Sequence, residues 1–204
     1  INVAPDEVRN YIGASQIGSE CYRKIWYEYN KYPATPITHK ILRTFELGKA
    51  LESKVIEWMK EAGLIIREWG PLIDSELLYF QGNIDAVYLT DDDNQAIIEI
   101  KTAKSASFNQ FVTHGLQKWQ PKYYDQVQAY KGMSHIHETY FIVFNKDNSE
   151  LHDEFIEFDE DRFQELREKA RLIHDAKTEP PRVSNNPMWY VCKLCKFNKI
   201  CHRG

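Results

Sequence analysis

A glutamate and a lysine lie two positions apart in the apolar stretch IIEIK, residues 97–101. Side chains alternate along a β-strand, so Ile98 and Ile100 would face one side of a sheet while Glu99 and Lys101 face the other. A buried charge is costly unless it is paired or binds a metal ion. The stretch therefore indicates either an ion pair on an edge strand or a site in which both charges take part in chemistry.

A second carboxylate precedes this stretch in the segment GNIDAVYL. Asp85 lies fourteen residues before Glu99, and the turn TDDDNQ between the two apolar segments predicts a β-hairpin. In a matching register, Asp85, Glu99 and Lys101 would meet at one place on the sheet. Two carboxylates favour a hard cation such as Mg²⁺, which polarises a phosphoryl oxygen and lowers the pKa of bound water. A lysine beside them can orient that water or stabilise a charged transition state.

Two helical segments hold further residues that this chemistry could use. Glu52 lies 33 residues before Asp85 in a long helical pattern, where on its own it would be an ordinary surface glutamate. In the segment YYDQVQAY, Gln126 and Tyr130 are four residues apart and share one helix face. The alternative for this second segment is an ordinary amphipathic helix with its tyrosines in the core.

The four cysteines form a one-plus-three pattern. The segment CKLCKFNKIC reads C-x2-C-x5-C, and one further cysteine lies 171 residues upstream of it. Two disulfides would suit a secreted protein, but no secretion signal is recognisable, so the cluster favours a metal centre. The candidate ligands are Cys21, Cys192, Cys195 and Cys201, with His202 as an alternative ligand in a zinc site.

Spacing and capping residues predict the elements that must position these groups. Ser15 is expected to begin a helix that runs through Tyr29, and Thr38 and Gly63 are expected to bound a long helix. Gly48 inside this long helix predicts close packing. Strands are expected at 64–69, 76–80, 83–89, 96–102, 138–146 and 151–158, with helices beginning at Pro121 and after Asp159, and a short helix with a loop within 106–118.

This order of elements predicts an α/β fold with a central mixed β-sheet flanked by helices. The length of 204 residues suits one domain, and the hydrophobic fraction of 43% suits a globular protein. The apolar runs are too short to span a bilayer, so we expect a cytoplasmic protein without a membrane partner. The net charge of −4 neither indicates nor excludes nucleic-acid binding, because only a local basic surface matters to a phosphate backbone.

The carboxylates and the lysine resemble the catalytic signature of the PD-(D/E)xK nuclease superfamily. Asp85 followed by Glu99-Ile100-Lys101 resembles the signature itself. Glu52 resembles the acidic residue in the first motif of phage-type exonucleases, at a place where RecB-like nucleases usually have histidine. The order and spacing of these motifs span nearly the whole chain.

The two remaining patterns resemble the RecB-like branch of the superfamily. Gln126 and Tyr130 match the Q-x-x-x-Y motif on the helix that follows the catalytic hairpin. The cysteine pattern resembles that of CRISPR-associated RecB-like nucleases and AddB-type nuclease domains, in which four cysteines bind a [4Fe–4S] cluster. Thiolate ligands alone suit either this cluster or zinc, and the resemblance favours the cluster.

The resemblance implies a restriction-endonuclease-like fold and a single nuclease domain over residues 1–204. Its core would lie at about 38–178, with a cluster staple formed by about 15–30 and 188–204. The implied activity is a Mg²⁺- or Mn²⁺-dependent DNA exonuclease, in recombination or repair, phage replication or CRISPR adaptation. The implied setting is the cytoplasm of a bacterium, an archaeon or a phage-infected cell, with single-stranded DNA or DNA ends, a second copy of the chain, or recombination and CRISPR proteins as partners.

An alternative function is a non-catalytic iron–sulfur or zinc module that binds DNA or a protein. The complete set of Asp85, Glu99 and Lys101 argues against it, because such a module would not need all three. As implied site residues we take Lys101 as the catalytic lysine, Asp85, Glu99 and the Ile100 carbonyl as metal ligands, Glu52 as a ligand directly or through water, and Gln126 and Tyr130 as supporting groups. Four lysines that flank the site in sequence or lie at strand ends are expected to bind phosphates: Lys104, Lys118, Lys122 and Lys146.

Overall fold

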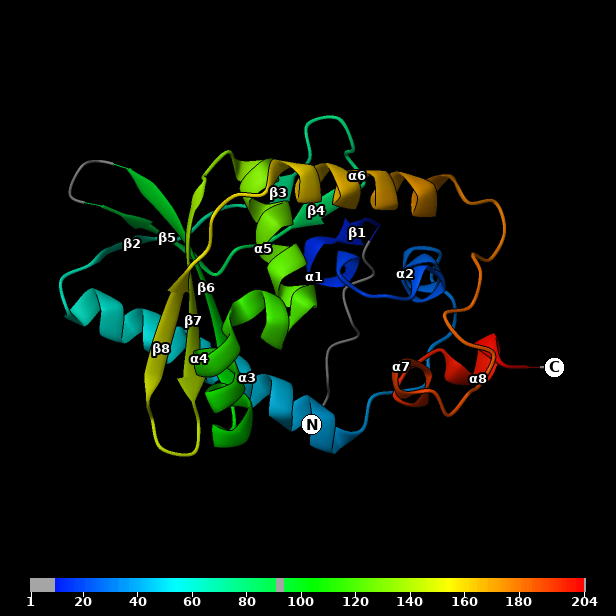
Figure 1. Ribbon diagram of the computed structural model, residues 1–204, viewed down its shortest axis with the longest axis horizontal. Coiled ribbons are helices and arrows are strands. Elements are labelled where there is room, and N and C mark those ends of the chain that lie inside the picture. The colour runs from blue at the N-terminus through cyan, green and yellow to red at the C-terminus, as the bar shows by residue number, and fades with distance from the viewer. Residues whose placement is uncertain (1–9, 91–93, 204) are drawn as a thin grey trace.

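The computed structural model describes residues 10–90 and 94–203 and contains a five-stranded mixed sheet (Figure 1). The strand order is β2-β5-β6-β7-β8, with β6 antiparallel to β5 and parallel to β7. This confirms the predicted α/β class and places the IIEIK stretch on the central strand, so the edge-strand alternative is wrong. The strands are β2 (Ile65–Arg67), β5 (Ala86–Leu89), β6 (Gln95–Ala103), β7 (Glu138–Asn145) and β8 (Leu151–Phe155).

The predicted hairpin forms between β5 and β6, with Ala86 opposite Ile98. One face of the sheet packs against α3 (His39–Glu61), where Val55 lies in a buried cluster with Ile98 and Ile100. The other face is covered by the next two helices (Figure 1). Each face of β6 therefore has its own hydrophobic core. The two helices on the second face are α4 (Ser105–Trp119) and α5 (Pro121–Ser134).

A second, three-stranded sheet lies next to α5 and has the strand order β1-β4-β3. Neither its first strand nor β3 was predicted, and the strand expected at 76–80 begins only at Phe80. The cause is a turn in which one Asp74 carboxylate oxygen accepts the backbone N–H groups of Glu76 and Leu77, at 3.0 and 2.8 Å. The strands are β1 (Ile12–Gly13), β3 (Leu72–Ile73) and β4 (Phe80–Gly82).

The helix expected from Ser15 is broken at Gly18 into α1 (Ala14–Ile17) and α2 (Tyr22–Tyr29). A Cβ at Gly18 would lie 2.6 Å from the backbone Cα of Lys122, so α5 passes too close for any larger residue. Cys21 consequently occupies the N-cap of α2 and does not lie inside a helix.

Several capping predictions are confirmed. The Thr38 side chain accepts the Ile41 N–H at the start of α3, and Gly63 adopts φ +90° just after its end. Asp159 caps α6 (Glu160–Asp175) by accepting the Arg162 N–H at 2.9 Å. Gly48 does not mark close packing, because the nearest atom to an added Cβ is the Thr102 hydroxyl oxygen at 4.0 Å.

Two further segments are more helical than expected. The short helix predicted within 106–118 extends over all of α4, with a kink at Gly115, where φ is +73°. The C-terminal cysteine segment contains two single-turn helices. These are α7 (Tyr190–Lys193) and α8 (Asn198–Cys201). In the part of the chain that the structure describes, no helix is both long and apolar enough to span a bilayer.

Candidate active site

Glu99 and Lys101 lie on the face of β6 opposite to Ile98 and Ile100, as the alternation predicts. The Glu99 side chain is buried, with 1% exposed, while that of Lys101 is 19% exposed. The Lys101 ammonium donates a hydrogen bond to Glu99 Oε1. The central strand, β6, thus holds an ion pair in which Glu99 is buried and Lys101 is partly exposed.

The side-chain amide of Gln126 on α5 donates a second hydrogen bond to Glu99 Oε1. Its Nε2 lies 2.8 Å from Glu99 Oε1 and 2.6 Å from the Tyr130 hydroxyl. Tyr130 is 2% exposed, and its ring lies 2.7 Å from the position that a Cβ on Gly82 would take. Gln126 therefore contacts Glu99 directly, and Tyr130 contacts Gln126. The Q-x-x-x-Y pair supports the Glu99 carboxylate from inside the protein.

Asp85 and Glu52 approach this pair from the neighbouring elements. Asp85, directly before β5, accepts the Ile100 N–H through Oδ2 at 2.8 Å, which places its carboxyl group beside the backbone of β6. Glu52 is half-buried on α3, and its charge acts on both Glu99 and Lys101. The structure thus brings together the residues that the sequence predicted from four separate segments.

Burial and mutual repulsion disfavour the charged forms of the carboxylates in this site, which a bound cation would stabilise. Burial raises the pKa of Glu99 to about 8, and Asp85 raises it further while Lys101 opposes the shift. Burial also raises the pKa of Glu52, against the attraction of Lys101. For Lys101, burial lowers the pKa, but the combined attraction of Glu99, Asp85 and Glu52 is larger, so its pKa is raised.

The carboxylate oxygens of the site could bind a divalent cation whose remaining coordination positions are filled by water or substrate. Glu99 Oε2 is buried and has no hydrogen-bond partner among the described residues, whereas Oε1 receives two donors. Across residues 10–90 and 94–203, no group of three or more His, Cys, Asp and Glu side chains is arranged to hold a metal ion. Mg²⁺ commonly takes one or two carboxylates and fills its other positions with water and substrate oxygens, so Asp85 and Glu99 suffice in kind and number.

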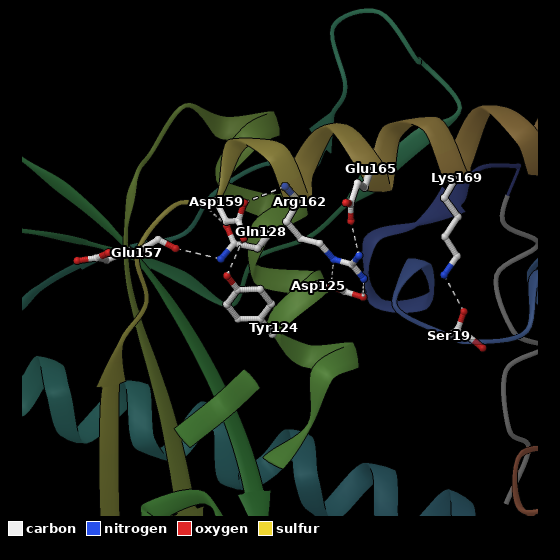
Figure 2. Close-up of polar contacts among 9 residues, drawn as sticks. All are labelled: Ser19, Tyr124, Asp125, Gln128, Glu157, Asp159, Arg162, Glu165 and Lys169. Atoms are coloured by element: carbon white, nitrogen blue, oxygen red, sulfur yellow. Dashed lines mark hydrogen bonds and ion pairs between the residues drawn. The ribbon is translucent and has the colours of Figure 1, made fainter. Parts of the chain in front are cut away.

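A polar network that the sequence analysis missed fixes the position of α5 (Figure 2). Arg162 of α6 binds both oxygens of the buried Asp125 at 2.7 and 2.8 Å. The Gln128 amide donates to the Glu157 carbonyl oxygen at 3.0 Å and accepts the Asp159 N–H at 2.9 Å. Buried polar side chains thus lie on several sides of α5, so the alternative of an ordinary amphipathic helix does not describe this segment. Every residue of α5 from Asp125 to Lys131 is buried, and this stretch includes Gln126.

The four lysines predicted to bind phosphates have different surroundings. Two ammonium groups lie near the ring of Tyr123, with Lys101 Nζ 5.4 Å and Lys122 Nζ 4.7 Å from the ring centre. Lys104 and Lys146 both act electrostatically on Asp147, beyond the ends of β6 and β7. Lys118 is exposed near the end of α4. Lys122 is therefore the predicted phosphate ligand that shares a neighbour with Lys101.

All four cysteines are free thiols and line one cavity. The elements that carry them, α2 and the C-terminal helices, lie side by side (Figure 1). Burial raises the pKa of the Cys192 and Cys195 thiols, and for Cys192 the other three cysteines add to the shift. His202 lines the same cavity. Phe197, between the second and third C-terminal cysteines, is 2% exposed and packs on Tyr27 with ring centres 5.3 Å apart, so an apolar contact also joins the two chain ends.

The site and the fold agree with the similarity of the chain to known proteins. Residues 15–202 match the sequence profile of the PD-(D/E)XK nuclease superfamily, and the chain belongs to this superfamily. No curated protein sequence matches it significantly.

Three solved structures share the fold at low sequence identity. The alkaline exonuclease LHK-Exo from Laribacter hongkongensis is 17% identical, with 81% of this chain and 87% of that chain covered and a TM-score of 0.63. SSO0001 is 20% identical over 98% and 88%, with a TM-score of 0.62. A phage-related exonuclease from Haemophilus somnus 129PT is 14% identical over 80% and 91%, with a TM-score of 0.56. At these identities the similarity concerns the fold alone.

Proposed function

We propose that the protein is a Mg²⁺- or Mn²⁺-dependent deoxyribonuclease of the exonuclease type. The observation that carries this proposal is the Glu99 carboxylate, which is buried on the central strand with one oxygen bound by Lys101 and Gln126 and the other unpaired. A buried carboxylate in this state costs stability unless a cation uses the open oxygen. Membership of a nuclease superfamily supports the same proposal, as does the fact that two structural neighbours are exonucleases.

Each residue then has a defined part in phosphodiester hydrolysis. Asp85 and Glu99, with the Ile100 carbonyl, would hold the cation, and Glu52 would bind it directly or through water. A bound divalent cation supplies a water of lowered pKa and stabilises charge on the phosphate oxygens. Lys101, whose side chain is 19% exposed, keeps its proton and can orient the attacking water or stabilise the charge that develops on the phosphate. Gln126 keeps Glu99 in position.

The test is a nuclease assay on 5′- and 3′-labelled, single- and double-stranded DNA, with closed circular DNA to separate exonuclease from endonuclease activity. We expect shortening of linear DNA that requires Mg²⁺ or Mn²⁺ and is lost in Asp85→Ala and Glu99→Ala. Lys177→Ala, which removes an exposed charge beyond the end of α6, is the control and should behave as the wild type. A folded wild-type protein that leaves every substrate intact would contradict the proposal.

For the cysteine site we propose a structural [4Fe–4S] cluster bound by Cys21, Cys192, Cys195 and Cys201. The support is that the four thiols line one cavity although they come from opposite ends of the chain. A centre that binds all four would close almost the whole chain into one loop and fasten α7 and α8 to α2. Hydrolysis at Glu99 and Lys101 needs no electron transfer, so the role of the cluster is to stabilise a single nuclease domain.

Metal analysis of anaerobically purified protein tests this assignment. We expect iron and acid-labile sulfide, a coloured preparation, and loss of both in each Cys→Ser variant together with a lower unfolding temperature. A colourless preparation with stoichiometric zinc would replace the cluster by a zinc site, with His202→Ala then testing the alternative ligand. Four titratable thiols in a stable and active protein would contradict any metal centre here.

A further inference from the structure

A second open site lies next to Asp85, in a groove between α3 and the edge of the sheet. The groove has a volume of about 460 Å³, within the range of about 300–1,000 Å³ typical of ligand sites. None of the sequence motifs points to it, and apart from Asp85 it contains none of the predicted site residues. We call it the α3–β2 groove, and the residues that matter for its chemistry are Ser53, Lys60, Arg67, Glu68, Trp69 and Asp85.

The strand register explains why this groove leads to the candidate metal site. β2 pairs antiparallel with β5, with Arg67 opposite Val87. Continuing this register by two residues would set Trp69 opposite Asp85, although the regular pairing ends at Arg67 and Gly70-Pro71 then turns the chain towards β3. Trp69 therefore lies two residues beyond the end of β2, and Trp69 and Asp85 both line the groove.

The side chains of the groove are available for a ligand. Trp69 is 40% exposed, and an indole at a groove wall offers a flat apolar surface. Lys60 and Arg67 are exposed and form no ion pair with any residue of the described ranges. Glu68 and Asp85 are the opposing charges, and a divalent cation at Asp85 would leave the groove with an excess of positive charge.

These features match the chemistry of a single nucleic-acid strand. Non-specific single-strand sites combine cationic groups that follow the phosphates with aromatic side chains on which bases stack. Bases inside a duplex are stacked on both faces, so a base within a strand can stack on Trp69 only where the strand is unpaired. We propose that the α3–β2 groove binds the unpaired nucleotide next to the scissile phosphate, with its base on Trp69 and its phosphate at Lys60 or Arg67.

This inference rests on the proposed function and can be tested separately from it. The probe is a fluorescein-labelled thymidine oligomer, with anisotropy measured in Ca²⁺, a hard cation with similar oxygen ligands, after a gel has shown that the oligomer stays intact. Trp69→Ala should weaken binding by roughly 5- to 150-fold, the size expected for losing one base stack. Trp69→Phe should keep most of the affinity and shows that the fold survives. Trp189→Ala, at a side chain that is 45% exposed, is the matched control and should bind as the wild type.

An abasic scan distinguishes stacking from a general effect on the fold. One abasic nucleotide, moved along the oligomer, should weaken binding to the wild type at one position and cause no further loss in Trp69→Ala, because the same contact is removed twice. Equal abasic losses in both proteins, or wild-type affinity in Trp69→Ala, would overturn the groove assignment while DNA cleavage by the wild type would still support the proposed function. A wild type that neither binds the oligomer nor cleaves DNA would overturn both.

Discussion

Two largely buried lysines of this protein differ in the partner that each ammonium group contacts and in the direction of the pKa shift. Lys101 on β6 meets the carboxylate of Glu99 and keeps its charge, since the surrounding acidic groups raise its pKa. Lys131 on α5 is fully buried and donates to a neutral group, the Ile156 carbonyl. Burial lowers the pKa of Lys131 to about 8, because the distant charges of Glu157 and Glu138 only partly oppose it.

The difference shows what makes a buried charge useful for chemistry. The Lys101 ammonium has a charged partner and its side chain is partly exposed, so under the proposed function it can meet a substrate phosphate without losing its proton. The Lys131 ammonium fills an internal position and satisfies one backbone carbonyl. Variants in the surroundings of Lys101 should lower the rate of DNA cleavage, whereas variants among the buried polar groups that hold α5 should lower or shift stability. The largest effect is expected at Lys101 itself.

Replacing Lys101 with Met keeps most of the side-chain volume and removes the charge. We expect DNA cleavage to fall by at least about 10²–10³-fold, the usual cost of deleting one pre-positioned electrostatic group. Lys131→Met should cleave at the wild-type rate per folded molecule. Single-turnover rates at saturating DNA measure this contrast, and comparable losses in the two variants would contradict the division of roles.

Gln126→Leu removes the second donor to Glu99 Oε1 and leaves Lys101 as its only partner. We expect a loss of roughly 10- to 100-fold in kcat, as found for groups that orient metal ligands. Gln128→Leu is the matched control, since this buried amide lies on the same helix and binds the start of α6. If Gln128→Leu lowered kcat as much as Gln126→Leu while the protein stayed folded, the positioning role of Gln126 would be wrong.

Arg162→Met leaves the carboxylate of Asp125, which is 5% exposed, without its bidentate partner. The free energy of unfolding should fall by about 1–3 kcal/mol, the cost of an unsatisfied buried polar group, with screening because the arginine itself is partly exposed. Urea unfolding measures the change. Arg171→Met removes an exposed pair with Glu168 and should change stability by less than about 1 kcal/mol.

The pH dependence of stability should reveal Lys131. Its folded pKa of about 8 lies below the value of about 10.4 expected in the unfolded chain, so the unfolded state binds more protons between these values. The penalty for burying this lysine is complete below about pH 8 and is relieved as the pH rises, so this group makes the wild type more stable with increasing pH in that window. Lys131→Met should remove up to about 1.4 kcal/mol per pH unit of this slope. An unchanged difference between wild type and variant from pH 8 to pH 10 would contradict the assignment.

The sequence determined the elements that follow from local patterns. Alternation in IIEIK set Glu99 and Lys101 on one face of a strand, and the short turn before it set the hairpin with β5. The caps at Thr38, Gly63 and Asp159 were readable because each acts on its own neighbours. The family resemblance supplied the expected roles of the site residues, which stay predictions until the variants are measured.

Contacts between distant segments decided the rest. The break at Gly18 depends on the path of α5, more than a hundred residues away in the chain, and no local signal announces it. The polar side chains of α5 looked like those of an ordinary surface helix, yet Asp125 finds its partner on α6 and Gln126 finds its partner on β6. A buried polar group is stable only when a partner meets it, and that partner is fixed by packing. The groove beside Asp85 arises in the same way, because the antiparallel pairing of β2 with β5 brings the segment that ends in Trp69 to the groove that Asp85 also lines.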